Sequence, residues 1–359
     1  MIFIFSIFVA GAIVFYNHYQ QSNIAEAIAA DIPKARRNCL VATDKVRMPT
    51  GGVVELLPTE EGLEIRTARW MPKGICRGTI LLCQGYTEFL EKYDEVVEEL
   101  LDRNFAIVIF DWRGQGLSSR LIRDPQKGHI TSFADFIKDA ELIYQKIVVP
   151  KMPAPYHIMG HSMGGHLAFR VLQEFPNHYT KAILCAPFFG WSPNFGAGKL
   201  NSMVVIIITN LMKAFGFSQA YAYGATPPSK AKTLPGQTSD RVRFQKRVRF
   251  YEVEPHLLMG GPTWNWILES TKSLALILQA KRIAKIQTPI LLASGAKDEI
   301  VDPQSHHTIV AKSKKIRLVD FPTSMHEILM EQDGIRDTFW QEFDQFMGLK
   351  MMNEKFAER

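Results

Sequence analysis

The feature that most constrains the fold is the pentapeptide Gly160-His161-Ser162-Met163-Gly164, together with the segments on either side of it. Residues 155–159 have the apolar content of a short buried strand, and residues 165–172 have helical spacing. A serine between a strand and a helix lies on a sharp turn, where glycines are needed because larger side chains would collide. The pattern therefore predicts a serine whose hydroxyl is held clear of its own backbone.

Strand-like and helix-like segments alternate along most of the chain. An antiparallel pair is expected at 53–57 and 63–67, and further strand-like runs at 79–83, 105–110, 155–159, 181–185, 289–293 and 316–320. Helical spacing occurs at 88–103, 133–148, 165–172 and 334–347. Continuous apolar runs are typical of strands covered on both faces, so the alternation predicts an α/β fold with a mostly parallel, doubly wound sheet. Such sheets place their chemistry at the carboxyl ends of the strands, where Ser162 is expected.

The alternation stops near Phe188 and resumes at Pro289. The segment between is rich in Trp, Met and Arg, and we interpret it as a helical lid inserted over the strand ends. Within it, residues 202–215 are too apolar for an exposed helix. The predicted organisation is an N-terminal apolar segment (1–30), the first part of an α/β core (45–187), the lid (188–288) and the second part of the core (289–350).

The predicted lid is also strongly basic. The whole chain has a net charge of +6, yet residues 190–289 contain 13 lysines and arginines against four acidic residues. A local basic excess favours anionic surfaces such as phospholipid head groups, although a solvated helix face is the simpler explanation. No recognised nucleic-acid motif accompanies the charge, so no nucleic-acid partner is predicted.

Residues 2–16 are uncharged and almost wholly apolar, and the first charged side chain is Glu26. The segment is shorter than the roughly 20 residues that a membrane span needs. No lysine or arginine precedes it, as one would in a secretory signal. A membrane anchor, an atypical signal peptide and a buried helix all remain open. We favour the anchor and expect a membrane-associated, otherwise cytoplasmic protein.

One of the ten histidines has a position that fits a general base. A serine hydroxyl is a weak nucleophile until a base takes its proton, and the base needs a carboxylate to orient it. His326 follows the last predicted strand, where a loop meets a helix, so it is expected at the same edge of the sheet as Ser162. We therefore predict that His326 is the base.

The orienting carboxylate is expected between the serine and the histidine in chain order. Asp298 lies in a turn-rich loop, Ser294-Gly295-Ala296-Lys297-Asp298, after the strand at 289–293. Asp302, four residues later, is its rival, and Glu299 is a weaker one. We predict that Asp298 fixes the tautomer of His326 and stabilises the imidazolium.

Backbone amides are expected to stabilise the oxyanion. The N–H of Met163 follows the serine at a helix start, and the N–H of Tyr86 lies in the loop after residues 79–83. Gln84, Gly85 and His161 are candidate substrate-binding residues, although a plain strand-to-helix turn also explains Gln84-Gly85. His161 and His166 lie too close in sequence to Ser162 to act readily as its base, so packing is their simpler role. Because no Cys-x-x-Cys or Cys/His cluster occurs, no metal is expected.

These motifs resemble the serine α/β-hydrolases, and within them the lysophospholipase and monoacylglycerol lipase group. The resemblance spans residues 53–347 and is most specific at 110–118, 160–165, 294–298 and His326-Glu327. It implies an α/β-hydrolase fold, the triad Ser162, Asp298 and His326, and no cofactor. Gly261-Pro262-Thr263-Trp264 is similar to the bacterial lysophospholipases, which adds Trp264 to the candidate substrate-binding residues. The family commonly has His-Gly and a small residue where this chain has Gln84-Gly85-Tyr86, which alters the expected shape of the acyl site.

The predicted function is hydrolysis of a carboxylic ester of a single-chain lipid through an acyl-enzyme. Lysophospholipid is the first choice of substrate and monoacylglycerol the second. The apolar N-terminus and the basic lid would both contact a membrane surface. The triad does not separate a hydrolase from an acyltransferase, a thioesterase or a small-ester esterase, because water or another nucleophile can resolve an acyl-enzyme. A catalytically silent binding protein also stays open.

Overall fold

The computed structural model describes residues 32–193, 198, 200–228 and 237–349. The predicted apolar segment 1–30 lies outside these residues, as do Lys199, Lys230 and Lys232 of the basic segment. Within the described ranges, no helix has both the length and the apolar character needed to cross a membrane.

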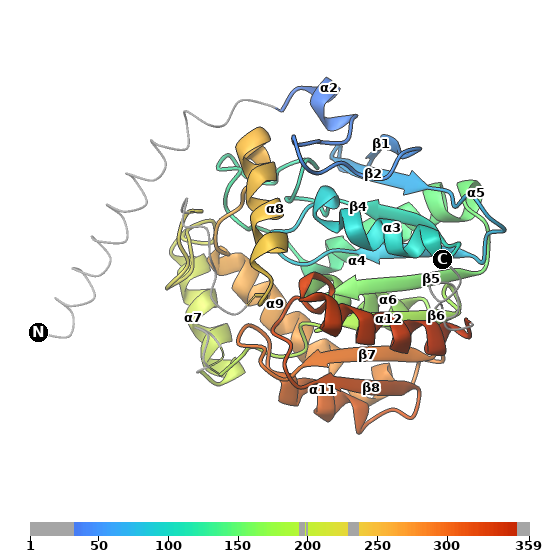
Figure 1. Ribbon diagram of the computed structural model, residues 1–359. Helices are drawn as coiled ribbons and strands as arrows, with labels where there is room; N and C mark the ends of the chain where they lie inside the picture. Colours follow the sequence, from blue (N-terminus) through green and yellow to red (C-terminus); the bar gives the residue numbers. More distant parts are fainter. Residues whose placement is uncertain (1–31, 194–197, 199, 229–236, 350–359) are drawn as a thin grey trace, which may run out of the picture.

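Among the described residues, eight strands form one sheet in the order β1-β2-β4-β3-β5-β6-β7-β8 (Figure 1). The strands are β1 (Val53–Pro58), β2 (Glu64–Trp70), β3 (Thr79–Cys83), β4 (Ala106–Phe110), β5 (Tyr156–His161), β6 (Lys181–Cys185), β7 (Ile290–Gly295) and β8 (Ile316–Phe321). The pairs β1–β2 and β2–β4 are antiparallel, and all the other neighbours are parallel. Both the mostly parallel sheet and its antiparallel start were predicted, and both are confirmed.

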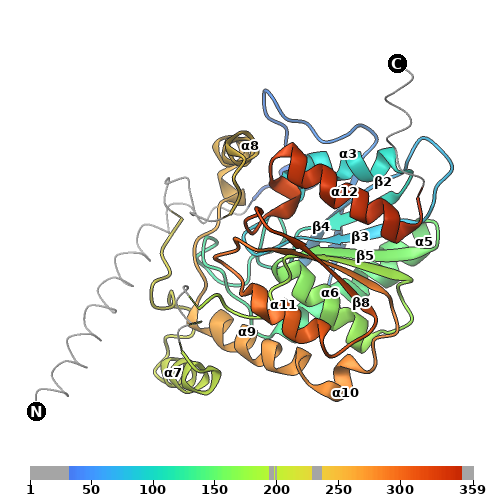
Figure 2. The same ribbon diagram turned by 60° about the horizontal axis from the view of Figure 1, so that its bottom comes forward.

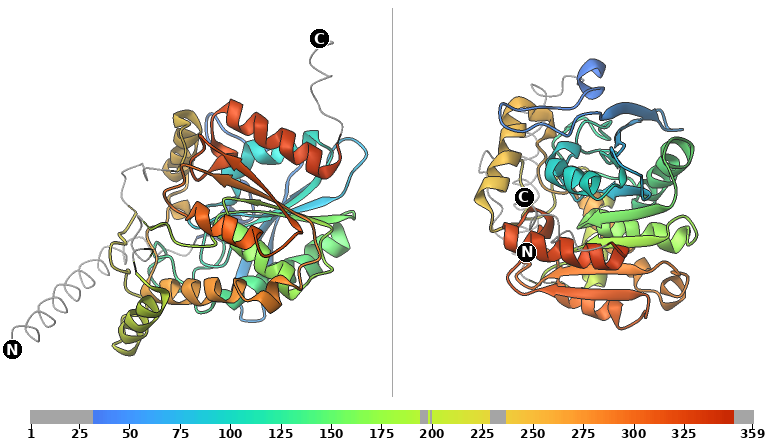
Figure 3. Two further views of the ribbon diagram at one scale, coloured as in Figure 1. Left: turned by 90° about the horizontal axis from the view of Figure 1, so that it is seen from below. Right: turned by 45° about the vertical axis from the view of Figure 1, so that its right-hand side comes forward.

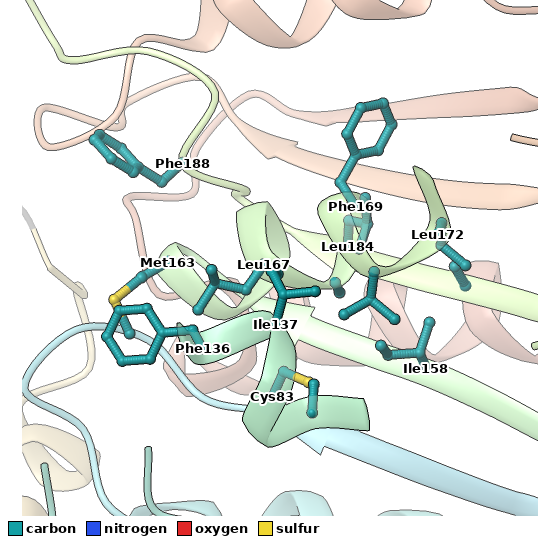
Figure 4. Packing of buried hydrophobic residues seen from close by; sticks show 14 of the residues in the cluster. Cys83, Phe136, Ile137, Ile158, Met163, Leu167, Phe169, Leu172, Leu184 and Phe188 are labelled. Atoms are coloured by element: carbon teal, nitrogen blue, oxygen red, sulfur yellow. The ribbon is translucent and has the colours of Figure 1, made fainter. Parts of the chain in front are cut away.

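Helices cover both faces of the sheet (Figures 2 and 3). One apolar cluster lies between the sheet and α4 (Phe133–Ile143), α6 (Met163–Glu174) and α11 (Pro303–Val310). Figure 4 shows part of it, with side chains of β3, β5 and β6 meeting those of α4 and α6. A second cluster joins the opposite face to α3 (Asp94–Asp102) and α12 (Asp333–Met347). Cys83 and Cys185 are buried free thiols within these clusters.

Two predicted helices are less regular than their sequence pattern. The helix expected at 88–103 begins with a 3-10 turn, η1 (Leu90–Tyr93), before α3. The helix expected at 133–148 continues from α4 into a π-helical turn, η2 (Tyr144–Val148). The remaining short helical segments outside the insertion, among the described residues, are α2 (Lys34–Arg37), α5 (Val149–Lys151) and η5 (Ile328–Met330).

Between β6 and β7 the chain leaves the sheet and forms a helical insertion. It contains α7 (Ser202–Ala214), α8 (Arg241–Val253), η4 (Pro255–Leu257), α9 (Trp264–Ile277) and α10 (Ala280–Ile283). The arrowheads of the parallel strands point toward the side of the molecule where α7 and α8 lie (Figure 1). The insertion corresponds to the predicted lid segment.

The prediction that residues 202–215 are too apolar for an exposed helix is wrong. These residues do form a helix, α7, but Val205 and Thr209 are its only buried members. Its exposed apolar side chains, with Phe215 just beyond its end, are Met203, Val204, Ile207, Ile208 and Leu211. Because α7 packs against α9 along one side, the other sides of a helix that is apolar all round stay exposed.

Candidate active site

Ser162 lies on the turn between β5 and α6, as the pentapeptide predicts. Its backbone has φ 54° and ψ −119°, a conformation that is strained for a residue with a Cβ. Hydrogen bonds on both sides hold the turn, because Ser162 N–H donates to the Cys185 carbonyl at 3.0 Å and the Ser162 carbonyl accepts from Phe188 N–H at 2.9 Å. A Cβ at Gly164 would lie 2.1 Å from the Cys83 carbonyl oxygen, so a glycine is required where α6 begins beside β3.

The structure brings Ser162, His326 and Asp298 together. The Ser162 Oγ lies 2.9 Å from Nε2 of His326, and His326 Nδ1 lies 2.6 Å from Oδ2 of Asp298. All three side chains are buried, and they come from three loops at the carboxyl ends of β5, β7 and β8. A serine, an imidazole and a carboxylate in this order can pass a proton from the hydroxyl to the ring while the carboxylate fixes the tautomer of the ring.

The two rival carboxylates are placed differently from Asp298. Asp298 Oδ1 accepts hydrogen bonds from the Ile300 and Val301 amides at 2.8 and 2.9 Å, which leaves Oδ2 directed at His326. Asp302 instead caps α11, where its Oδ1 accepts from Gln304 N–H at 3.0 Å. Among the described residues, no contact links Glu299 or Asp302 to His326. The geometry therefore favours Asp298.

The charges around His326 change its pKa. Burial by itself would lower the pKa of His326, but the Asp298 carboxylate, by charge and by hydrogen bond, raises it above the ordinary value of 6.5, with smaller contributions from Glu327 and Glu88. Burial would likewise raise the pKa of Asp298, and the charge and hydrogen bond of His326 and the amides of Val301 and Ile300 lower it instead. Each group thus favours the charged form of the other.

The raised pKa of His326 predicts the pH dependence of the activity. A base must be neutral to accept a proton, so activity is lost as the pH falls through the pKa of His326. We expect the acid limb of kcat/KM to have its midpoint above the ordinary histidine value of 6.5. A pH–rate profile with p-nitrophenyl acetate measures this midpoint. A limb at or below the ordinary value would contradict the charge arrangement described here.

The two predicted oxyanion donors lie at the ends of β3 and β5. Among the hydrogen bonds of the described residues, neither Tyr86 N–H nor Met163 N–H has an acceptor in the protein. The Tyr86 hydroxyl donates to the Gly260 carbonyl of the insertion at 3.1 Å, which orients this side chain. The oxyanion roles of both amides stay predictions that the geometry permits.

The other candidate substrate-binding residues differ in their burial and in their hydrogen-bond partners. The Gln84 side chain is fully buried, and its Nε2 donates a hydrogen bond of 2.9 Å to Oδ1 of Asp111, which directly follows β4. Gly85 N–H donates to Glu88 Oε2 at 2.5 Å. Trp264 is half-buried at the start of α9. Substrate contact by Gln84, Gly85 and Trp264 stays a prediction.

An aromatic cluster beside Ser162 was missed from the sequence. Trp266 of α9 packs against Tyr86 with ring centroids 4.7 Å apart, and it also contacts Phe188 and Trp191. Phe188 is the residue whose N–H binds the Ser162 carbonyl. The signal was the aromatic content of the insertion, but helical spacing alone does not tell which rings pack together.

A buried charge cluster behind the serine was also missed. His161 Nδ1 lies 3.1 Å from Glu88 Oε1, and His161 Nε2 lies 3.3 Å from the carbonyl oxygen of His326. Lys92 Nζ lies 2.5 Å from Glu88 and 2.9 Å from Glu327. His161 therefore contacts charged and backbone groups of the core, and substrate contact by His161 stays a prediction.

Three of the five cations on α8 are paired with acidic residues of the core. Arg243 Nε lies 2.7 Å from Glu95 Oε2, Lys246 also contacts Glu95, and Arg247 Nη1 lies 3.1 Å from Glu327 Oε1. These three cations are therefore neutralised by carboxylates within the protein, and they leave no free charge for an anionic surface.

Comparison with known proteins identifies the family. Residues 74–333 match the family described as serine aminopeptidase, S33. The chain is 30% identical to lysophospholipase L2 of Escherichia coli K12 over 269 residues, which are 72% of this chain and 76% of that one. The chain belongs to this family of serine α/β-hydrolases. The resemblance inferred from the motifs is thus confirmed, and with it the assignment as a carboxylic ester hydrolase.

One further relative and one solved structure are also similar to this chain. The probable lysophospholipase L2 of Haemophilus influenzae is 28% identical over 283 residues, covering 78% of this chain and 86% of that protein. A soluble variant of monoglyceride lipase from Saccharomyces cerevisiae, solved with a substrate analogue, superposes with a TM-score of 0.68 and 19% identity over 85% of this chain and 99% of that one. At this identity the structural likeness shows the α/β-hydrolase fold alone.

Proposed function

We propose that the protein hydrolyses the carboxylic ester of a single-chain lipid through an acyl-enzyme, with Ser162 as nucleophile, His326 as base and Asp298 as the orienting carboxylate. One observation carries the proposal: the Ser162 Oγ, on a strained turn, lies 2.9 Å from His326 Nε2, and Asp298 lies 2.6 Å from the opposite ring nitrogen. This arrangement is the one that acyl transfer by a serine requires.

The steps follow from the geometry. The Ser162 Oγ attacks the ester carbonyl carbon while His326 Nε2 takes the hydroxyl proton, and the carbonyl oxygen becomes an oxyanion. The amides of Met163 and Tyr86 donate to that oxyanion. When the C–O bond of the ester breaks, His326 gives its proton to the leaving alcohol, and the acyl group stays on Ser162. His326 then takes a proton from the water molecule that attacks the acyl-enzyme carbonyl, and it returns this proton to the Ser162 Oγ as the bond between Oγ and the acyl carbon breaks and the fatty acid leaves.

The relatives support a lipid substrate. The Escherichia coli and Haemophilus influenzae proteins are a lysophospholipase L2 and a probable one, and the yeast structure is a monoglyceride lipase. Both kinds of substrate have one acyl chain, and both present an ester to water at the surface of a lipid aggregate. We therefore propose lysophospholipid as the first substrate class and monoacylglycerol as the second.

The exposed face of α7 supports contact with such an aggregate. Its apolar side chains include Met203 at 71% exposure and Ile207 at 56%. The sequence has no acidic residue between Glu174 and Asp240, so no carboxylate of this segment opposes an anionic surface. We propose that the insertion is a lid that meets the lipid surface through α7 rather than through α8, where most cations face core carboxylates.

A substrate panel tests the proposed function. We expect kcat/KM to be higher for lysophosphatidylcholine and for a long-chain monoacylglycerol than for p-nitrophenyl acetate or butyrate, because a long chain buries more apolar surface in the acyl site. Product analysis should show free fatty acid with water as the acyl acceptor. A strong preference for the acetyl or butyryl ester, or transfer of the acyl group to another nucleophile, would instead favour a small-ester esterase or an acyltransferase.

The same panel tests the proposed contact of α7. The double variant Ile207→Ser/Leu211→Ser should lose about 10-fold or more of its activity on vesicles containing lysophosphatidylcholine, since each exposed apolar side chain contributes on the order of 1 kcal/mol when it enters a lipid surface. Its activity on soluble p-nitrophenyl acetate should not change. Asn210→Ser, on the same exposed helix, is the matched control. Equal losses on both substrates would contradict a lipid contact.

A further inference from the structure

Residues 237–247 of the insertion cross the loop that carries His326. The Glu327 amide donates to the Gln237 carbonyl at 2.7 Å, only one residue after His326. Thr238 Oγ1 donates to the Met330 carbonyl at 2.7 Å, and Arg243 Nη1 donates to the Glu331 carbonyl at 2.9 Å. The insertion therefore binds the backbone of this loop at several successive points.

Arg247 of α8 completes this contact from above the loop. Its side chain is only 11% exposed. Its Nη1 lies 3.1 Å from Glu327 Oε1, and its Nη2 donates to Gln237 Oε1 at 2.5 Å. One planar guanidinium thus binds the carboxylate of Glu327 and the side chain of Gln237, and the carbonyl of Gln237 accepts the hydrogen bond from the Glu327 amide. A guanidinium presents two donors in a fixed fork, so it sets both distance and direction.

Further contacts connect Arg247, through Glu327, to the predicted oxyanion loop and to the backbone of His326. Lys92 forms ion pairs with both Glu327 and Glu88. Glu88 also accepts a hydrogen bond of 2.5 Å from the Gly85 amide of the predicted oxyanion loop. Glu88 also contacts His161, whose Nε2 lies 3.3 Å from the His326 carbonyl. The buried cluster has two carboxylates and two cations, so removal of Arg247 leaves one carboxylate without its counter-charge.

We propose that Arg247, a residue of the insertion, is a positioning residue that holds the His326 loop in place for proton transfer. The inference rests on the proposed role of His326 as the base. It gives α8 a function different from binding an anionic surface, because the fork of Arg247 is occupied by Glu327 and Gln237. Arg247 acts through Glu327 and the backbone of the loop, and it does not touch the reacting atoms.

The expected signature is a loss in kcat that does not depend on the substrate. A loosened His326 loop lengthens the distance between Nε2 and the Ser162 Oγ, and a misplacement of about 1 Å lowers rates by up to about 100-fold. We expect Arg247→Met to lower kcat about 10- to 100-fold on both p-nitrophenyl acetate and lysophosphatidylcholine, with little change in KM. Arg247→Lys keeps the charge but not the fork, so it should recover part of the loss.

The pH profile provides a second readout that a loss of folded protein would not move. The charged and titratable groups around His326 are Asp298 after β7, Glu327 in its own loop, Glu88 in the loop after β3, Lys92 from η1, His161 from β5, His306 from α11 and Arg247 from α8. Loss of the cation leaves more net negative charge near the imidazole. The acid limb of kcat/KM should therefore move to higher pH in Arg247→Met and stay in place in Arg247→Lys.

The experiment compares these variants with Arg241→Met and His326→Ala in the full-length protein. Arg241 lies exposed in the first turn of the same helix, and its replacement should leave kcat on both substrates unchanged. Wild-type kcat on p-nitrophenyl acetate in Arg247→Met, or a loss confined to lysophosphatidylcholine and shared by Arg241→Met, would overturn the inference.

If Arg247→Met does not fold, Gln237→Met provides a second variant. It removes the Gln237 Oε1 acceptor of Arg247 without leaving a charge unpaired, and it should lower kcat on both substrates. A Gln237→Met protein with wild-type kcat would then overturn the inference.

His326→Ala separates this inference from the proposed function. If His326→Ala is inactive and Arg247→Met has wild-type kcat, the base assignment stands and the positioning role fails. If His326→Ala keeps activity near wild type, the proposed function itself fails.

Discussion

Ser162→Ala is expected to lower ester turnover by about 10⁴- to 10⁶-fold while leaving the protein folded. The substitution removes one buried oxygen and its contact with His326 Nε2, and it leaves the turn without a nucleophile. The hydrogen bonds that hold the turn come from the backbone of residue 162, so alanine preserves them. Turnover of p-nitrophenyl acetate measures the activity, and thermal unfolding measures the stability.

A fluorophosphonate probe gives the control for this prediction. It should label the wild-type protein and not Ser162→Ala, since it reacts only with an activated serine. Residual turnover of the order of wild type in a folded Ser162→Ala protein would rule out the serine mechanism. A folded wild-type protein that the probe does not label would favour a catalytically silent binding protein.

Asp298→Asn should lower kcat by about 10⁴-fold, because an amide in place of the carboxylate favours the wrong tautomer of His326 and does not stabilise the imidazolium. The wild-type contact is the 2.6 Å pair between Asp298 Oδ2 and His326 Nδ1. Removing this negative charge should also shift the acid limb of kcat/KM to lower pH, opposite in direction to the shift expected for Arg247→Met. Steady-state kinetics across the pH range measure both effects.

Asp302→Asn is the matched control, because it makes the same chemical change four residues away. Asp302 caps α11, and asparagine caps a helix about as well as aspartate does. We expect kcat within a few-fold of wild type for this variant. A larger loss in Asp302→Asn than in Asp298→Asn would reverse the assignment of the carboxylate.

Local sequence patterns predicted the core of the fold well. Each core strand has a continuous apolar run or an alternating pattern, and burial on both faces of a parallel sheet requires such runs. The same patterns failed for α7, where they suggested burial but the structure leaves most of the helix exposed. A hydrophobic pattern indicates that burial of a segment would be favourable, but it does not indicate whether another surface of the protein covers that segment.

In the candidate site, too, local sequence patterns predicted some residues and missed others. Ser162, His326 and Asp298 each follow a recognisable strand, and parallel strands bring their carboxyl ends to one edge, so topology alone predicted their proximity. Glu88, Lys92, Glu327 and Arg247 come from three separate stretches of chain, and charges at such positions are typical of a solvated surface. Their pairing depends on how η1, α8 and the His326 loop pack together, for which the sequence carries no periodic signal.

The sequence by itself determined the parallel sheet, the turn that presents Ser162, and the choice of His326 and Asp298, because each of these depends on local spacing and on the order of the strands. Only the tertiary structure decided that α7 is exposed, that three of the five cations of α8 face core carboxylates, and that Arg247 reaches the loop of His326. The physical reason is that an ion pair or an exposed face depends on which surfaces meet in space. Residues far apart in the chain, such as Arg247 and Lys92, become neighbours only when the insertion packs against the sheet.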